Sequence, residues 1–200
     1  MHLSLGTGNH LSENPSQTQF IVPYVVDALD AAGNAVPNAV ITLEIHATYY
    51  YKGRYVAGTS AWVWTPSTPA GCENEDIDLT GIYNRYKDGF QDAGYATNPD
   101  YDSEGNQNGK LDPGGTATVS PGTVTTGSDG SATFNVEYPE DQANWITVQL
   151  TATTSVSGTE TSARTTFQLP ILASYLTTLT SSPPGQPSPY GVAGVCTNPN

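Results

Sequence analysis

Apolar and polar residues alternate over several stretches of the chain, which is the pattern of β-strands with one buried face. In residues 39–48, every second side chain is apolar: Ile41, Leu43, Ile45 and Ala47. The same spacing later in the chain places four side chains on one face: Ala132, Phe134, Val136 and Tyr138. Further strands are predicted at 20–29, 145–156 and 163–169, with 145–156 the longest.

Turn-forming residues separate these strands at short intervals. Polar turns are predicted at 30–34, 121–122, 128–130 and 157–158, and a hairpin is predicted to join 49–55 to 61–65. About seven short strands, with a turn signal roughly every 8–12 residues, are typical of an immunoglobulin-like sandwich. We therefore predict an all-β protein, an immunoglobulin-like Greek-key β-sandwich whose strands lie within 18–65 and 116–170.

Two segments depart from this pattern. Residues 66–115, the insertion, are dense in Gly, Asn and Asp and are too long for an ordinary loop. We expect the insertion to be mostly irregular, and to be functional, ordered by metal or disordered. Residues 171–200, the tail, are rich in proline, so we expect them to run extended over the surface. All parts are predicted to belong to one domain over 1–200.

The charge of the chain is strongly negative and is concentrated in the insertion. The net charge of −13 over 200 residues argues against partners such as nucleic acid or an anionic membrane. Ten of the 19 acidic residues lie between Glu73 and Asp112, beside only three cations: Arg85, Lys87 and Lys110. Such a segment repels itself unless it binds a cation. The alternative is a solvated acidic loop.

The chain has two cysteines, Cys72 and Cys196. We expect a disulfide between them, with two free buried thiols as the alternative. The bridge would tether the tail to the start of the acidic residues and stabilise the fold by about 4–5 kcal/mol. No apolar run is long enough to insert into a membrane, and the start of the chain lacks a signal-peptide pattern. We expect a piece of a larger exported protein.

Several stretches resemble bacterial immunoglobulin-like domains of the invasin and intimin kind: VVDALDAAGNAVPNAVITLEI, GSDGSATFNV and WITVQLTATTSVSGTETSARTTFQLP. More narrowly, CENED, NGKLDPGG and SPPGQPSPYG resemble immunoglobulin-like modules of large gammaproteobacterial surface proteins, in which a Cys-x-Asn-Glu-Asp segment opens a pair of Asp/Asn/Gly loops. The resemblance extends from about Gly6 to Cys196. It implies the fold and an extracellular location at the bacterial cell surface, but neither a reaction nor a named ligand.

Residues 76–84 match the first nine positions of a calcium-binding loop, with Gly81 at the turn. The oxygen ligands would come from alternate positions: Asp76, Asp78, Thr80, the carbonyl of Ile82, and Asn84. The twelfth position is Lys87, which cannot be a ligand. The closing carboxylate would therefore come from Asp88 or Asp92.

A second loop, residues 100–112, fits the calcium pattern in two registers. In one register three acids precede Gly105: Asp100, Asp102 and Glu104. In the other, the ligands on either side of Gly109 are Glu104, Asn106, Asn108, the carbonyl of Lys110, and Asp112. The family resemblance favours the second register, with Asp102 able to replace or supplement Glu104.

Ligand sets made only of oxygen favour calcium over zinc or copper, so Cys72 is better assigned to the disulfide than to a metal. We predict two Ca²⁺ ions, which would turn a self-repelling insertion into a rigid projection. The alternative is a flexible Asp/Asn/Gly linker.

Catalysis is not expected. Of the three histidines, His2 and His10 lie near an N-terminus that we expect to be frayed, and His46 lies on a strand. An aromatic group around Tyr51, Trp62 and Trp64 could stack on sugar rings, because Trp62 and Trp64 share one face of the predicted hairpin. The favoured alternative is that these side chains pack against the rest of the fold.

The sequence therefore favours a structural or adhesive surface module whose partners are other domains or subunits of a surface protein or extracellular filament, with a glycan or a host or abiotic surface as further candidates. A calcium-bearing carbohydrate-binding module is the second interpretation, and an enzyme accessory domain the third.

Overall fold

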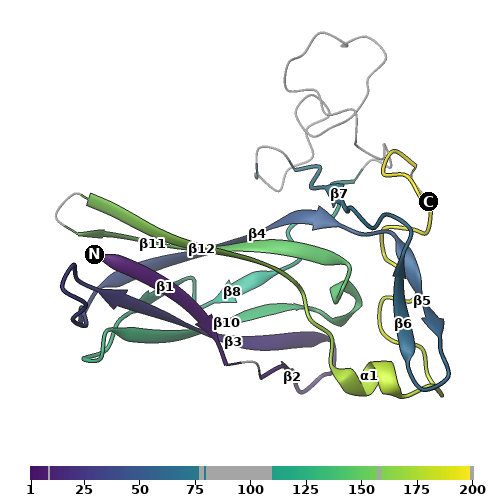
Figure 1. The fold of residues 1–200 in the computed structure, drawn as a ribbon, viewed down its shortest axis with the longest axis horizontal. Coiled ribbons are helices and arrows are strands. Elements are labelled where there is room, and N and C mark those ends of the chain that lie inside the picture. The colour runs from purple at the N-terminus through teal and green to yellow at the C-terminus, as the bar shows by residue number, and fades with distance from the viewer. Residues whose placement is uncertain (9, 77–78, 80–109, 157–158, 199–200) are drawn as a thin grey trace, which may run out of the picture. The chain divides into compact units, whose positions relative to one another are not determined.

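The computed structural model describes residues 1–8, 10–76, 79, 110–156 and 159–198 (Figure 1). Over these residues the chain is nearly all β, apart from a 3-10 turn (Glu140–Gln142) and the five-residue helix α1 (Ala173–Thr177). The predicted all-β class is confirmed. In this described portion, no helix has the length and apolar character needed to span a membrane.

The chain forms two compact units, each built from three segments. The first comprises Met1–His46, Ala117–Pro139 and Val148–Phe167, and the second comprises Ala47–Thr116, Glu140–Thr147 and Gln168–Asn200. Strands β4 (Val40–Tyr50) and β11 (Ile146–Val156) contribute residues to both units. The units are therefore not consecutive domains along the chain.

One antiparallel sheet of the first unit has β3 (Gln19–Leu29) at its centre. Its order is β1 (His2–Thr7), β3, β10 (Ser131–Pro139) and β8 (Thr118–Ser120), and β2 (Ser12–Glu13) also pairs with β3. Alternate side chains of β3 are buried, from Phe20 to Ala28. The two-residue period read from the sequence therefore gives the buried face directly.

The N-terminal strand corrects two expectations. Sequence reasoning predicted no strand before residue 18 and a frayed N-terminus, whereas β1 pairs with β3 from His2↔Leu29 to Thr7↔Tyr24. Pairing stops there and resumes in β2 at Ser12↔Ile21. The gap lies beside Pro23. The carbonyl of Pro23 accepts a hydrogen bond from Thr7 Oγ1 at 3.2 Å, but proline has no N–H to donate to the neighbouring strand.

The second sheet of the first unit contains β12 (Thr159–Gln168), β11, β4 and β9 (Thr123–Thr125), with β9 paired to the start of β4. Ile41 and Leu43 of β4 are buried, while Val40, Thr42 and Glu44 are exposed, as the alternation predicts. On β11, Val148, Leu150 and Ala152 are fully buried. The sequence predicts that this strand is the longest. It has eleven residues, but β3 and β4 have eleven as well, so among the described strands three share the greatest length.

The buried faces of the two sheets meet in a sandwich core. The ring of Tyr24 on β3 lies 5.4 Å from that of Phe167 on β12 and 5.8 Å from that of Phe134 on β10. Burying an apolar side chain of this size contributes about 1.5–3 kcal/mol, so the packing of these faces stabilises the first unit.

The second unit contains the hairpin of β5 (Gly53–Ala57) and β6 (Trp62–Pro66), paired from Gly53↔Pro66 to Ala57↔Trp62. The predicted hairpin is present but shorter, because Tyr49 and Tyr50 are the last residues of β4. Within the predicted insertion, β7 (Cys72–Glu73) forms a further short strand.

The tail is docked on this unit rather than extended over its surface. It contains α1, and Ser188 and Tyr190 are buried. The side-chain amide of Gln186 pairs with both main-chain groups of Tyr55, accepting from its N–H at 2.5 Å and donating to its carbonyl at 2.8 Å. The tail thus covers the outer edge of β5 as another strand would.

A glycine lets the tail approach Trp145. The indole Nε1 of Trp145 donates to the carbonyl of Gly185 at 2.8 Å. Gly185 has a φ of +69°, and a Cβ at this position would collide with the carbonyl oxygen of Asp141 and with the indole. Any other residue would push the tail away from the ring.

Candidate functional site

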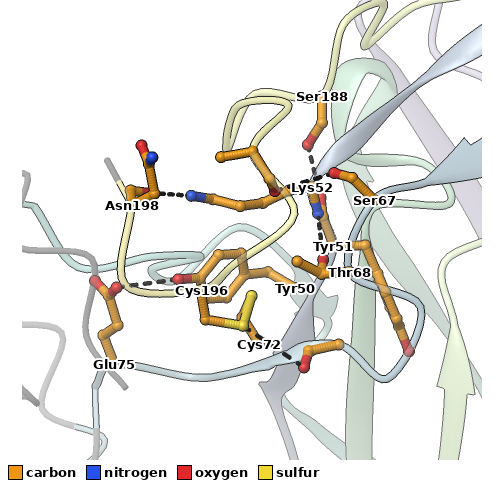
Figure 2. The surroundings of a disulfide bond; sticks show 12 residues. Tyr50, Tyr51, Lys52, Ser67, Thr68, Cys72, Glu75, Ser188, Cys196 and Asn198 are labelled. Carbon is orange, nitrogen blue, oxygen red and sulfur yellow. Dashed lines mark hydrogen bonds between the residues drawn. A yellow bond between two sulfur atoms is a disulfide. The ribbon is translucent and has the colours of Figure 1, made fainter. Parts of the chain in front are cut away.

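The described ends of the insertion meet in the second unit, in a cluster that we call the base of the insertion: Tyr50, Lys52, Cys72, Glu75, Asp112, Tyr190 and Cys196. Figure 2 shows five of these residues: Tyr50, Lys52, Cys72, Glu75 and Cys196. Strand β7 positions its first part, because it pairs antiparallel with the end of β4. Tyr50 lies opposite Cys72, and both are buried.

A disulfide joins Cys72 to Cys196, with a Cα–Cα separation of 5.4 Å. This confirms the predicted bridge and excludes two free thiols. The bond links residues 124 positions apart and fixes the end of the tail beside β7.

Glu75 connects the two ends of the predicted ligand segment. Its N–H donates to the carbonyl of Asp112 at 2.9 Å, and its Oε2 accepts from the N–H of Asp112 at 3.0 Å. Its other carboxylate oxygen, Oε1, accepts from the hydroxyl of Tyr50 at 3.1 Å (Figure 2). The Glu75 side chain is only 2% exposed, so these bonds replace the water that a buried carboxylate would otherwise need.

Lys52 supplies a buried positive charge to the base. Its Nζ donates to the main-chain carbonyl of Asn198, near the end of the tail (Figure 2). Burial lowers the pKa of Lys52 below its ordinary value of 10.5, while the negative charges of Asp112 and Glu75 act to raise it. The positive charge of Lys52 is therefore attracted to the carboxylates of Glu75 and Asp112, at the two ends of the insertion.

Tyr190 places a tail side chain against the same cluster. Its ring lies 5.0 Å from that of Tyr50, and its hydroxyl donates to Oε1 of Gln142. Burial raises the pKa of Tyr190 well above its ordinary value, and the negative charges of Asp112 and Asp141 raise it further. Tyr190 is therefore a neutral hydrogen-bond donor at neutral pH.

Three of the predicted calcium ligands belong to the described residues: Asp76, Lys110 and Asp112. Asp76 is buried, and its N–H donates to Oδ1 of Asn74 at 3.0 Å. Asn74 is itself fixed to the end of β4, because its Nδ2 donates to the carbonyl of Ala47 at 2.9 Å. The start of the first predicted loop is thus anchored to a strand.

The remaining predicted ligands lie outside the described residues: Asp78, Thr80, Ile82, Asn84, Asp88, Asp102, Glu104, Asn106 and Asn108. Among the residues that are described, no group of three or more His, Cys, Asp or Glu side chains is arranged to hold a metal ion. The carboxylates of Asp76 and Asp112 are the hard oxygen donors that suit calcium. Calcium binding by this chain stays a prediction.

The aromatic side chains considered for ligand stacking contact one another and the tail. Trp64 lies edge-on to Tyr51, with 5.4 Å between ring centres, and 5.9 Å from Trp145. The Nε1 of Trp62 donates to the carbonyls of Thr178 and Ser181, at 3.2 and 3.0 Å. These contacts favour packing over an open stacking platform.

Sequence reasoning missed Lys52, Glu75 and Tyr190 as members of the base. Glu75 precedes the first calcium-loop position, and Lys52 stands in a run of tyrosines, but neither pattern indicates a partner. Their roles arise from contacts between residues that are far apart in sequence, such as Lys52 with Asn198.

Replacing Glu75 by Gln is expected to destabilise the protein by about 1–3 kcal/mol. The amide would lose the negative charge opposite Lys52 and could not accept from both Tyr50 and Asp112. Urea unfolding followed by circular dichroism measures this change. The exposed neighbour Glu73 provides the matched control, since Glu73→Gln should change stability by less than about 0.5 kcal/mol. Equal effects of the two substitutions would contradict the role of Glu75.

Comparison of the chain with protein-family models, with curated proteins and with solved structures finds no match. Its function is therefore inferred from its own residues and from the geometry of the base of the insertion.

Proposed function

We propose that this chain is a non-catalytic, immunoglobulin-like structural or adhesive module of the bacterial cell surface, in which calcium makes the insertion rigid. The module would belong to a larger surface protein or to an extracellular filament. Its partners would be neighbouring domains or subunits, or a glycan or host or abiotic surface that the insertion reaches.

The observation that supports this proposal most is the closure of the insertion at its base. Glu75 and Asp112 exchange two hydrogen bonds, and the Cys72–Cys196 disulfide lies three residues before Glu75. A segment whose ends are held together has lost much of its chain entropy already. Ions bound within it would then need to order only the remaining residues.

The charge balance supports cation binding. Of the ten acidic residues between Glu73 and Asp112, Glu75 and Asp112 share Lys52. Eight acidic residues are then left for the three cations of this segment: Arg85, Lys87 and Lys110. Two Ca²⁺ ions would add four positive charges and remove most of the excess repulsion.

Calcium is expected to stabilise the protein by about 2 kcal/mol for each ion when its concentration is about 30–100 times the dissociation constant. In a chain of this length, each kcal/mol corresponds to roughly 2–4 °C in melting temperature. Scanning calorimetry in 10 mM CaCl₂ and in excess chelator should therefore show a rise of roughly 8–16 °C for two ions whose dissociation constants are about 0.1–0.3 mM.

Asp76→Asn should reduce this calcium-dependent rise, because it removes the first predicted ligand charge. Glu44→Gln is the matched control, since Glu44 is exposed on β4 of the first unit and should leave the rise unchanged. A melting temperature that is the same with calcium and with chelator would refute the proposed role of calcium.

The carbohydrate-binding interpretation has less support. It requires Tyr51, Trp62 and Trp64 to present a flat face to sugar rings, whereas Trp64 packs against Tyr51 and Trp145, and Trp62 is hydrogen-bonded to the tail. We therefore favour the structural or adhesive function.

A further inference from the structure

Strand β12 is an open edge of its sheet. It is the last strand in the sheet order, and among the described strands only β11 pairs with it. Its ten residues, Thr159–Gln168, contain no Pro, Gly or Lys. Natural sheets often protect an edge with Lys, Pro, a bulge or an inward-facing charge. Here the outer N–H and C=O groups are left available for another strand.

The two charges of β12 are arranged symmetrically. Glu160 and Arg164 are the only charged residues of the strand, both are exposed, and Ser162 lies midway between them. Four residues of extended chain span about 13 Å, so Glu160 and Arg164 cannot reach each other within one strand. Within the described part of the protein, neither side chain has a hydrogen-bond or ion-pair partner.

We propose that β12 pairs antiparallel with β12 of a second copy of this chain, about a two-fold axis that passes through Ser162. In this register Glu160 of each copy lies directly opposite Arg164 of the other, which gives two equivalent ion pairs. Thr161 lies opposite Ala163, so the inner face of the β12–β12 interface contains only small side chains. The surface is self-complementary, as a two-fold interface requires.

The charges also select this register over its neighbours. Moving the pairing by one residue would place Glu160 opposite Ala163 or Thr165, so both ion pairs would be lost. Opposite charges that face each other across antiparallel strands stabilise the pair, and like charges destabilise it. The occupant that satisfies both charges at once is therefore a second β12 strand.

Sedimentation velocity over a range of protein concentrations tests the proposal. The wild type should form dimers at high concentration. Glu160→Arg and Arg164→Glu should each weaken association by about tenfold or more, because both ion pairs become repulsive. The double variant E160R/R164E should restore the wild-type dimer. An equimolar mixture of the two single variants should also associate, because one chain then carries two positive charges on β12 and the other carries two negative charges opposite them.

Glu44→Arg provides the control, because Glu44 is exposed on β4 of the same sheet but away from its β12 edge. Circular dichroism verifies that each variant remains folded, which is expected because the substituted side chains are exposed. A wild type that stays monomeric at about 1 mM would overturn the proposal. So would single variants that associate like the wild type, or a mixture of them that associates no better than either alone.

Discussion

Replacing Cys72 and Cys196 together by Ala is expected to lower the free energy of unfolding by about 4–5 kcal/mol. The bond closes a loop of 124 residues, so its loss returns a large conformational entropy to the unfolded chain. The total stability of a domain is about 5–15 kcal/mol, and the melting temperature should fall by roughly 10–20 °C.

Urea unfolding of the double variant, with the wild type as reference, measures this loss. Wild-type protein in a strong reductant is the matched control, because it loses the bond without a substitution at the buried Cys72 position. A change below about 1 kcal/mol in both samples would show that the bridge does not hold the tail on the second unit.

The second large effect is expected at high pH, where the protein should unfold between about pH 10 and pH 12. Burial raises the pKa of Tyr24 and of Tyr55 to about 12, and it also raises the pKa of Tyr138 and of Tyr190. A tyrosine whose pKa is raised in the folded state stabilises the fold below its unfolded pKa of about 10, and this contribution is lost as the pH rises above that value.

For Tyr24 and Tyr55, whose pKa values are raised to about 12, the expected loss is about 2 kcal/mol each at pH 12, and the raised pKa values of Tyr138 and Tyr190 add to this loss in the same direction. The sum is a large part of the stability of a domain, which is about 5–15 kcal/mol. Lys52 acts in the opposite direction, since its lowered pKa makes its burial less costly as the pH rises toward 10.5. That gain is complete near pH 10.5 and therefore cannot prevent unfolding at higher pH.

Phenolate absorbance and circular dichroism, recorded together from pH 8 to pH 12.5, test this expectation. The part of the phenolate signal that comes from the buried tyrosines should appear together with the loss of the β signal, because ionisation of these residues requires unfolding. Tyr24→Phe removes one ionisable group and should raise the midpoint of alkaline unfolding. Phenolate formation that is complete before any loss of β signal would contradict the burial-based explanation.

The fold was largely predictable from local patterns. The alternation in 39–48 and in 131–138 gives the buried faces of β4 and β10, because the side-chain period of a strand is fixed by its backbone. Strand β1 was missed because its sequence, HLSLGT, is short. Its strand conformation depends on pairing with β3, which is remote in sequence.

The candidate site was predictable only where neighbouring residues carry the signal. The spacing of acids and glycine from Asp76 onward is a local pattern, and an even number of cysteines suggests a bridge. By contrast, the contacts of Lys52 with Asn198 and of Gln186 with Tyr55 join residues more than 100 positions apart. No local sequence pattern indicates such contacts, because they depend on how the chain between the two residues folds.

The disulfide also determines how the chain would respond to a pulling force. Tension that enters before Cys72 and leaves after Cys196 passes through the covalent bond, so the residues between them carry no load. At about 3.6 Å per residue, roughly 450 Å of chain is thereby withheld from extension. Residues 73–115 of the insertion lie within this shielded length, so the contacts between Glu75 and Asp112 at its base would persist while the rest of the chain is stretched.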